Sequence, residues 1–206
     1  MPDSFPQPVR LDTVPSTNDA ARRLAERGAP HGLAVIARTQ TAGRGRRGHG
    51  WHSPPGGLYA SFVLRPPAWP ATRAPILAPL AGLAVFRALR SFRVPSLLGK
   101  SPNDVLAAGR KIAGILVEPR ISSGTVEFAV VGIGVNLAQT AADFPPPLDA
   151  TATSARILGL SIAPGDLFPV LATGLLALLP LPPDAIAHAW HLACTDPAKL
   201  PEKLPA

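Results

Sequence analysis

Short apolar runs separated by glycine- and proline-rich turns make up most of this sequence. The runs that are rich in β-branched residues are too short for helices, so they predict buried strands. These predicted strands cover residues 33–37, 58–64, 97–98, 105–106, 111–118 and 126–135. Turn signals at 108–109 and 122–124 join the last three into a meander of adjacent strands.

A second group of segments shows the wider apolar spacing that is typical of helices. Ser16, followed three residues later by Asp19, predicts a capping box that starts a helix over 17–27, and Gly28 ends it. The other predicted helices cover residues 76–92, 153–158, 166–179 and 184–193. Residues 1–15 are expected to form a short extended lead-in. Together these elements predict an α+β fold, in which a mixed sheet is packed with helices.

Length and composition indicate one globular domain. The 206 residues are 47% hydrophobic with a mean hydropathy of +0.21, which separates the chain from disordered proteins. No internal repeat divides the sequence. We expect a single domain over residues 1–206, with its core over about 10–193 and a short tail over 194–206.

Targeting signals are not expected in this sequence. The N-terminus has no basic region followed by an apolar core, so it does not resemble a signal peptide. The longest apolar stretch, residues 170–181, is shorter than a membrane span. Cys194 is the single cysteine, which excludes an intramolecular disulfide and gives no metal-ligand set. These features predict a cytoplasmic protein with no membrane partner.

Residues 38–57 form a polar, glycine-rich stretch without periodicity, which is unusual inside a compact domain and is generally functional. Within it, glycines alternate with Arg44, Arg46 and Arg47, and the whole chain has a net charge of +7. Glycine lets a backbone wrap closely around an anion whose oxygens bind guanidinium groups, so this loop predicts a phosphate-bearing or acidic ligand. The loop matches neither the Walker A pattern nor the dinucleotide fingerprint. Taken alone, it is also compatible with nucleic-acid binding, although few aromatic residues lie near it for stacking.

A second polar group lies around the predicted strand 111–118. Lys111 immediately precedes an apolar run, and a cation is expensive to bury there unless it meets a negative partner. We therefore expect its ammonium to point toward an anion at the face of the sheet. Asn103 and Asp104 follow Pro102 in a turn and offer oxygen atoms to a cation or a ribose. A hairpin with a polar turn explains the same residues without any ligand.

The third group is Gly132, Gly134 and Asn136, within and just after the last predicted strand. Two glycines in a strand permit the close approach of a ligand or of another backbone, and the asparagine amide can read a hydrogen-bonding edge. A bulged strand that ends in asparagine is the alternative explanation.

Together and in this order, these segments resemble the biotin protein ligase family. The resemblance spans about residues 10–193 and rests on segments 16–18, 40–47, 53–54, 58–61, 102–104, 110–118 and 132–136, together with Trp51. It implies the ligase catalytic domain, whose fold is related to class II aminoacyl-tRNA synthetases and to lipoate ligases. It also implies ATP and biotin as substrates, Mg²⁺ as the accompanying ion, and a biotin carboxyl carrier domain as the partner that supplies the acceptor lysine.

The site residues of that family carry over position by position. The implied biotin-binding residues are Ser16, Thr17, Asn18, Gln40, Arg44, Gly45, Arg46, Lys111, Gly114 and Leu116. The implied ATP-binding residues are Arg44, Arg46, Asn103, Asp104, Lys111 and Asn136, with 103 and 104 beside the phosphates and Mg²⁺. Lys111, Arg46 and Arg44 are the implied catalytic residues, because joining a carboxylate to a phosphate requires both anions to be neutralised and aligned. No metal-ligating residue set is predicted.

The implied activity has two steps. Biotinyl-5′-AMP forms from biotin and ATP, and a carrier lysine then attacks this mixed anhydride and releases AMP. No covalent enzyme intermediate is required. No residue is assigned as a dedicated general base, and Asp104 is the only candidate. The resemblance is compatible with a homodimer. Two alternatives stay open: a lipoate or octanoate ligase of the same fold, against which the glycine–arginine loop argues, and a non-catalytic protein that binds biotin or retains its adenylate.

The chain departs from the family pattern in two respects. Ser101 stands where that family has tryptophan, which predicts a gap in the packing of the pocket. The family usually continues into an SH3-like barrel, whereas this sequence ends at Ala206 and has few residues before Ser16 for a helix-turn-helix domain. We therefore expect the catalytic domain alone, without a repressor role or a specific nucleic-acid partner.

Overall fold

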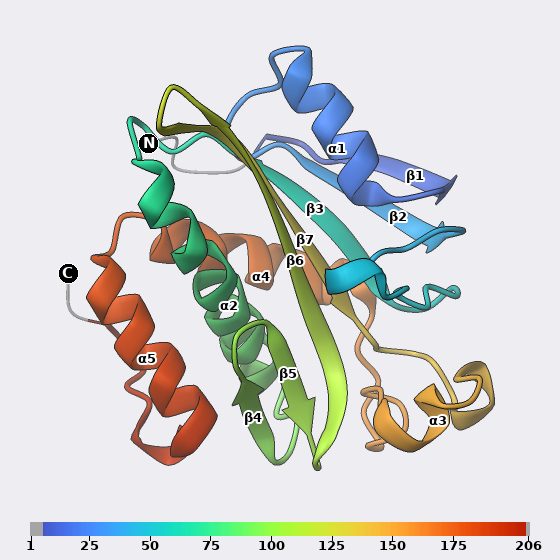
Figure 1. The fold of residues 1–206 in the computed structure, drawn as a ribbon. Helices are drawn as coiled ribbons and strands as arrows, with labels where there is room; N and C mark the ends of the chain where they lie inside the picture. The colour runs from blue at the N-terminus through green and yellow to red at the C-terminus, as the bar shows by residue number, and fades with distance from the viewer. Residues whose placement is uncertain (1–5, 205–206) are drawn as a thin grey trace.

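The computed structural model describes residues 6–204, and its centre is a seven-stranded mixed sheet (Figure 1). The strands are β1 (Val9–Val14), β2 (Ala34–Gln40), β3 (Leu58–Leu64), β4 (Leu97–Lys100), β5 (Asp104–Ala107), β6 (Arg110–Ser122) and β7 (Thr125–Val135). Their order in the sheet is β1-β2-β3-β7-β6-β5-β4. Only the β1–β2 pair is parallel, and the other neighbours within the described residues are antiparallel. The predicted α+β fold and the β5–β6–β7 meander are thereby confirmed.

Helices cover both faces of this sheet, but unequally. The longer helices are α1 (Thr17–Glu26), α2 (Leu77–Ser91), α4 (Pro164–Leu178) and α5 (Pro183–Thr195). The short ones are η1 (Arg46–Gly48), η2 (Ala71–Ile76), η3 (Ala141–Asp143), α3 (Leu148–Thr151) and η4 (Pro197–Lys199). Helices α2, α4 and α5 form one large core with the sheet, whereas α1 packs on the opposite face over β2, β3 and β7 (Figure 1). The α1 face therefore stays partly open.

The side chains of β7 explain where that face is closed and where it is open. Alternate residues of a strand point to opposite faces of the sheet. Residues 129, 131, 133 and 135 are apolar and buried in the large core, whereas Phe128 and Val130 lie under α1. The next two positions on the α1 face are Gly132 and Gly134, which have no side chain to fill the space beyond the helix. The glycines predicted to allow close approach therefore lie where the cover of α1 ends.

Residues 71–91, which comprise η2 and α2, are long and apolar enough to cross a membrane by length and composition alone. The structure buries 61% of the most apolar part of this segment against the rest of the protein. The side chains of Leu80, Leu83 and Phe86 are each at most 1% exposed. A helix that is apolar on most of its surface is expected at the centre of a core, which is where α2 lies.

The predicted lead-in over residues 1–15 contains a strand that sequence patterning did not reveal. Residues 1–5 lie outside the described part, but β1 pairs in parallel with β2 after the α1 crossover. Most of its side chains are exposed because it is an edge strand, so it lacks the apolar run that identifies an inner strand. At the other end of the chain, Leu200 of the predicted tail is buried in the large core.

Two local predictions were wrong. Residues 153–158 do not form a helix, because their N–H groups bind elsewhere: Thr153 donates to the Lys111 carbonyl at 2.9 Å, and Ala155 donates to the Asn136 carbonyl at 3.2 Å. The helix in this region is α3, immediately upstream. The capping box at Ser16 is also absent, because Ser16 makes no side-chain capping bond and Asp19 pairs with Arg44 instead.

Candidate active site

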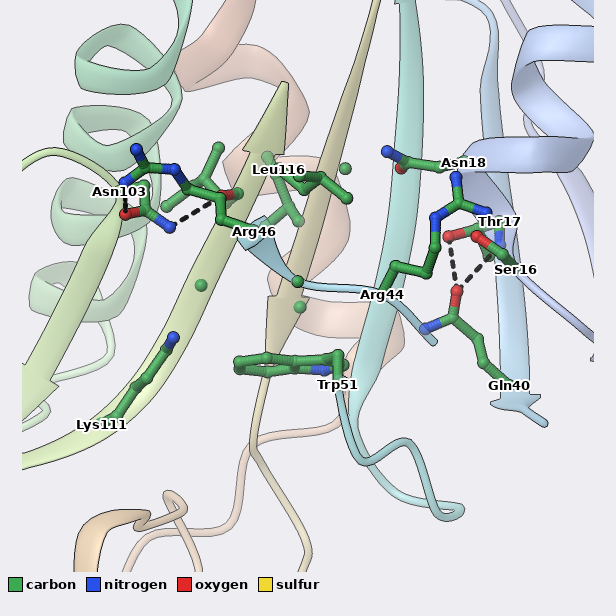
Figure 2. Close-up of a pocket in the computed structure, with 16 residues that line it drawn as sticks. Ser16, Thr17, Asn18, Gln40, Arg44, Arg46, Trp51, Asn103, Lys111 and Leu116 are labelled. Carbon is green, nitrogen blue, oxygen red and sulfur yellow. Dashed lines mark hydrogen bonds between the residues drawn. The ribbon is translucent and has the colours of Figure 1, made fainter. Parts of the chain in front are cut away.

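A cleft opens on the α1 face of the sheet, with Trp51 lying across its floor (Figure 2). Gly114 of β6 and Gly134 of β7 are cross-strand partners, and the indole packs directly on both. A Cβ atom at position 134 would lie 2.8 Å from Cζ2 of the indole, and one at position 114 would lie 2.9 Å from Cζ3, so neither position has room for a side chain. The empty volume of the cleft is about 470 Å³, its open mouth included. The glycine pair thus provides a flat, apolar channel.

One end of the cleft is polar and preorganised. Gln40 at the end of β2 accepts hydrogen bonds through Oε1 from the backbone N–H of Thr17 at 2.8 Å and from the Thr17 hydroxyl at 3.0 Å. Its Nε2 donates to Ser53 Oγ at 2.9 Å, which fixes the orientation of the amide. Ser16 is only 2% exposed, makes no capping bond and lines the cleft. Its hydroxyl is therefore available to a ligand.

A second set of hydrogen bonds continues this polar end toward β6. The buried Ser61 hydroxyl lies 2.6 Å from Asn18 Oδ1 and 2.8 Å from Thr17 Oγ1, so its single proton is shared between two acceptors. Asn18 Nδ2 donates to Glu118 Oε2 at 2.7 Å. Asn18 also lies over Gly132, where an added Cβ would come within 2.9 Å of its Cγ. The chain of contacts therefore fixes which way the Asn18 amide points.

The opposite end of the cleft carries a cation. Lys111 Nζ lies 2.8 Å from Asp104 Oδ1 and 5.2 Å from the centre of the Trp51 ring. Both residues are partly exposed, so the pair remains accessible from the cleft. The predicted anionic partner of Lys111 is thus Asp104, on the neighbouring strand β5. Figure 2 shows Lys111 and the Ser16–Gln40 group on opposite sides of Trp51.

The glycine–arginine loop covers the cleft from above. Arg44 Nη1 lies 2.6 Å from Asp19 Oδ2 of α1, and Arg44 Nη2 lies 3.2 Å from Glu118 Oε1 of β6. The hydrogen bond to Asp19 raises the pKa of Arg44, burial opposes this, and the charge of Glu118 raises the pKa further. Arg46 crosses to the other side and donates to Asn103 Oδ1 at 2.9 Å (Figure 2). Two guanidinium groups are thus placed above the channel, one on each side.

Most of the residues predicted from sequence come together in this cleft. Those that line it are Ser16, Thr17, Asn18, Gln40, Arg44, Gly45, Arg46, Asn103, Lys111, Gly114 and Leu116. They come from four separate segments of the chain, so their convergence is a property of the fold. The roles assigned to them individually stay predictions.

Two predicted residues do not line the cleft. Asp104 lies behind Lys111 and reaches the site through that ion pair. Asn136 is 3% exposed, and its Nδ2 donates to the Thr153 carbonyl at 3.0 Å, which ties the end of β7 to the following loop. Ser101, where a gap in the packing was predicted, is exposed and also does not line the cleft.

Several residues were given no role in the site from the sequence. Trp51 forms the floor, Ser61 supports the polar end, and Asp19 and Glu118 hold Arg44. Ser61 could have been singled out from the sequence, because it is the only non-aromatic residue of the apolar strand 58–64 whose side chain can form a hydrogen bond. Glu118 ends an apolar run, but its pairing with three donors could be read only from the structure.

The described residues 6–204 do not present a clustered set of metal ligands. No group of three or more His, Cys, Asp or Glu side chains in that range could hold a metal ion. The carboxylates nearest the cleft are each paired with a cation: Asp104 with Lys111, Asp19 with Arg44, and Glu118 with Arg22 and Arg44. A magnesium ion usually takes one or two carboxylates together with substrate phosphates. These residues therefore fit an ion that arrives with a nucleotide and is held mainly by its phosphates.

Comparison with known proteins supports one family. Residues 11–136 match the biotin/lipoate A/B protein ligase family. The chain is 40% identical to "Bifunctional ligase/repressor BirA" of Bacillus spizizenii over 147 residues, covering 71% of this chain and 45% of that protein. It is 46% identical to "Biotin--[acetyl-CoA-carboxylase] ligase" of Paracoccus denitrificans over 130 residues, covering 62% of this chain and 53% of that protein. The chain thus spans about half the length of these relatives.

Solved structures give the same result for the fold. The biotin protein ligase of Leishmania major in complex with biotinyl-5-AMP is similar with a TM-score of 0.77 and 28% identity, covering 98% of this chain and 86% of that one. The biotin protein ligase of Aquifex aeolicus in complex with biotin and ATP is similar with a TM-score of 0.71 and 31% identity, covering 85% of this chain and 71% of that one.

Proposed function

The chain belongs to the biotin/lipoate A/B protein ligase family, and within it we propose that this protein is an ATP-dependent biotin ligase. The observation that carries the proposal is a single cleft with a hydrogen-bonding end, an apolar channel and three cationic side chains, Lys111, Arg44 and Arg46. Biotin has the complementary order of groups: a polar ureido ring, an aliphatic tail and a carboxylate. The similar Leishmania and Aquifex structures, which contain biotinyl-5-AMP and biotin with ATP, support the same choice of ligands.

The polar end would bind the ureido ring. That ring carries one carbonyl acceptor and two N–H donors, so its recognition needs both kinds of partner at fixed positions. Ser16 offers a free hydroxyl, and Thr17, Asn18 and Gln40 have amide and hydroxyl orientations fixed by their own hydrogen bonds. A preformed set of this kind costs little ordering entropy when the ligand binds. We assign the head group of biotin to these four residues.

The channel would hold the aliphatic tail. Gly114, Leu116 and the Trp51 ring offer apolar surface, and the two paired glycines let the tail approach the strands closely. Its direction, from Gln40 past Trp51 toward Lys111, would bring the carboxylate to the cationic end (Figure 2). Burying the methylenes of the tail would contribute about 0.8 kcal/mol for each CH₂.

Adenylation joins two anions, and their repulsion is the main obstacle. Lys111 lies where the carboxylate would meet the α-phosphate, and Arg44 and Arg46 of the covering loop can neutralise both groups and hold them in line. An oxygen of the biotin carboxylate would attack the α-phosphorus, and pyrophosphate would leave. Asp104 would hold the Lys111 ammonium in place during this step. Arg44 would have to exchange a carboxylate partner for the substrate.

The nucleotide would lie beyond Lys111. Asn103 lines the cleft next to Arg46 and would face the phosphates, while Asp104 would face the accompanying Mg²⁺ only by loosening its pair with Lys111. We propose that Asn136 acts on the adenine side through the loop that it holds, because its own amide is already bound to Thr153. Mg²⁺ would supply further neutralisation of the phosphates.

In the second step the acceptor would be a lysine of a biotin carboxyl carrier domain. Its amine nitrogen would attack the carbonyl carbon of biotinyl-5′-AMP, forming an amide, losing a proton and releasing AMP. The names of the Paracoccus and Bacillus relatives as ligases support this reaction class. Residues 10–193 would be the catalytic core.

Pyrophosphate exchange into ATP tests this proposal and its substrate choice together. The purified chain is incubated with ATP, Mg²⁺, labelled pyrophosphate and one acid: biotin, lipoate or octanoate. We expect exchange that depends on biotin and is weaker by at least a factor of about ten with the other two acids, because neither has a ureido ring to engage the polar end. Exchange that favours lipoate or octanoate would reassign the substrate. Biotin binding without any exchange would indicate a non-catalytic binder.

A further inference from the structure

Glu118 lies between the polar end of the cleft and the arginine loop, and we infer that it is a positioning residue that couples the two. In the proposed function these two parts bind the biotin ring and the reacting anions, so the inference rests on that function for its ligands. Its contacts, however, belong to the ligand-free protein. Glu118 lies near the middle of β6, opposite Val130, and its side chain is 22% exposed on the α1 face of the sheet.

Three donors from two different segments meet on this one carboxylate. Asn18 Nδ2 donates to Oε2 at 2.7 Å, and Arg44 Nη2 lies 3.2 Å from Oε1 and 3.3 Å from Oε2. Arg22 Nη2 lies 3.0 Å from Oε1 on the outer side, where its own side chain is 44% exposed. A carboxylate can accept several hydrogen bonds at once, so the contacts coexist.

Asn18 depends on Glu118 for its orientation. Its Oδ1 accepts from the buried Ser61 hydroxyl at 2.6 Å, so only Nδ2 is left to face β6. Gly132 below it provides the room for the amide. Without the carboxylate, Nδ2 would lose its only acceptor in the described structure, and the amide would be free to turn away from the cleft.

Arg44 depends on the same carboxylate for part of its hold on the sheet. The loop reaches α1 through Arg44 and Asp19, reaches β6 through Arg44 and Glu118, and reaches the 101–103 turn through Arg46 and Asn103. Its internal bonds are few, such as Gly45 N–H to the His49 carbonyl at 2.7 Å. Because Glu118 binds Asn18 and Arg44 together, a change in the polar end of the cleft is felt in the covering loop.

The first test needs no ligand. Amide hydrogen exchange is measured over residues 41–51 in the full chain, for the wild type, Glu118→Leu, Glu118→Gln and Arg22→Gln. We expect exchange in this loop to quicken at least about tenfold in Glu118→Leu, because a hydrogen bond to a charged group is lost. Glu118→Gln should quicken it less, because it keeps an acceptor, and Arg22→Gln should change it less than twofold. Exchange in α2 serves as the internal reference for stability.

The second test uses biotin. Glu118→Leu is expected to weaken biotin binding about tenfold and to raise the KM for ATP, because Asn18 and Arg44 each lose a partner. Glu118→Gln should keep Asn18 in place and so raise the KM for ATP more than the Kd for biotin. If Glu118 only stabilised the fold, its replacement would lower Tm without any difference between the change in the KM for ATP and the change in the Kd for biotin.

The outcomes separate this inference from the proposed function. Loop exchange and biotin affinity within twofold of the wild type in a folded Glu118→Leu would overturn the inference, as would faster loop exchange with unchanged biotin affinity. If Glu118→Leu does not fold, unchanged behaviour of Glu118→Gln in both assays would overturn it equally. A wild-type protein that binds no biotin would refute the proposed function, and the exchange measurement would then still decide whether Glu118 holds the loop.

Discussion

Replacing Gly134 with alanine should damage the cleft more than the fold. The new Cβ would overlap Cε2 and Nε1 of Trp51, and β7 cannot retreat because it is hydrogen-bonded to β3 and β6 on both sides. Trp51 is half-buried at the end of a largely exposed loop and is the part that can move. Overpacking of this kind costs about 1–3 kcal/mol. Since the loop relieves the strain by lifting the indole off Gly134, most of that cost should appear in ligand binding.

The expected result is a loss of biotin affinity of about 5- to 150-fold, which is the same 1–3 kcal/mol expressed as a binding constant. Calorimetry with biotin measures the loss. Tryptophan fluorescence reports the cause, because Trp69 and Trp190 are buried in the large core and only Trp51 lies in the cleft. The matched control is Gly174→Ala in α4, where an added Cβ meets nothing within 4 Å. Normal biotin affinity in Gly134→Ala, or a loss of stability with normal affinity, would refute this reasoning.

Three further predictions follow from the same structure. Lys111→Ala should lower pyrophosphate exchange about a hundredfold, on the order of 3 kcal/mol, with an unchanged Tm, and near-normal exchange would remove Lys111 from the reaction. Amide exchange over residues 43–50 should slow markedly when biotin and ATP are added, because bound anions tether the arginines, and equal rates with and without ligand would contradict this. Burial lowers the pKa of His31 below its usual value of 6.5, so the unfolded chain binds more protons and stability should fall as the pH is lowered from 6.5 toward the pKa in the folded protein. His31→Asn keeps an acceptor for the Arg65 N–H, so its Tm should fall less between pH 7 and pH 5 than that of the wild type.

Sequence reasoning succeeded where local pattern and burial agree. The strand 58–64 was predicted to the residue, because its seven side chains are all buried between bounding turns. The meander of β5, β6 and β7 followed from turn signals at 108–109 and 122–124. The cleft residues were found by their resemblance to a family, and the physical reason for each became clear only when the sheet brought the four segments together.

It failed where distant contacts override local preference. Strand β1 is mostly exposed and is held by backbone pairing to β2, which no side-chain pattern records. Residues 153–158 look helical, but the Lys111 and Asn136 carbonyls bind their N–H groups. Asp19 has the spacing of a capping residue, yet an arginine 25 positions later is its partner. The role of Glu118 has the same origin, because Asn18 is 100 residues away in sequence.

The most direct test of the central claim is the mass of a carrier domain after incubation with this chain. The mixture contains ATP, Mg²⁺, biotin and a biotin carboxyl carrier domain, and Lys111→Ala serves as the control variant. The account predicts that the carrier domain gains the mass of one biotinyl group on a lysine, that the gain requires both ATP and biotin, and that it is strongly reduced in Lys111→Ala. A carrier domain of unchanged mass, with no biotinyl-5′-AMP formed in the same mixture, would contradict the assignment of this cleft as the active site of a biotin ligase.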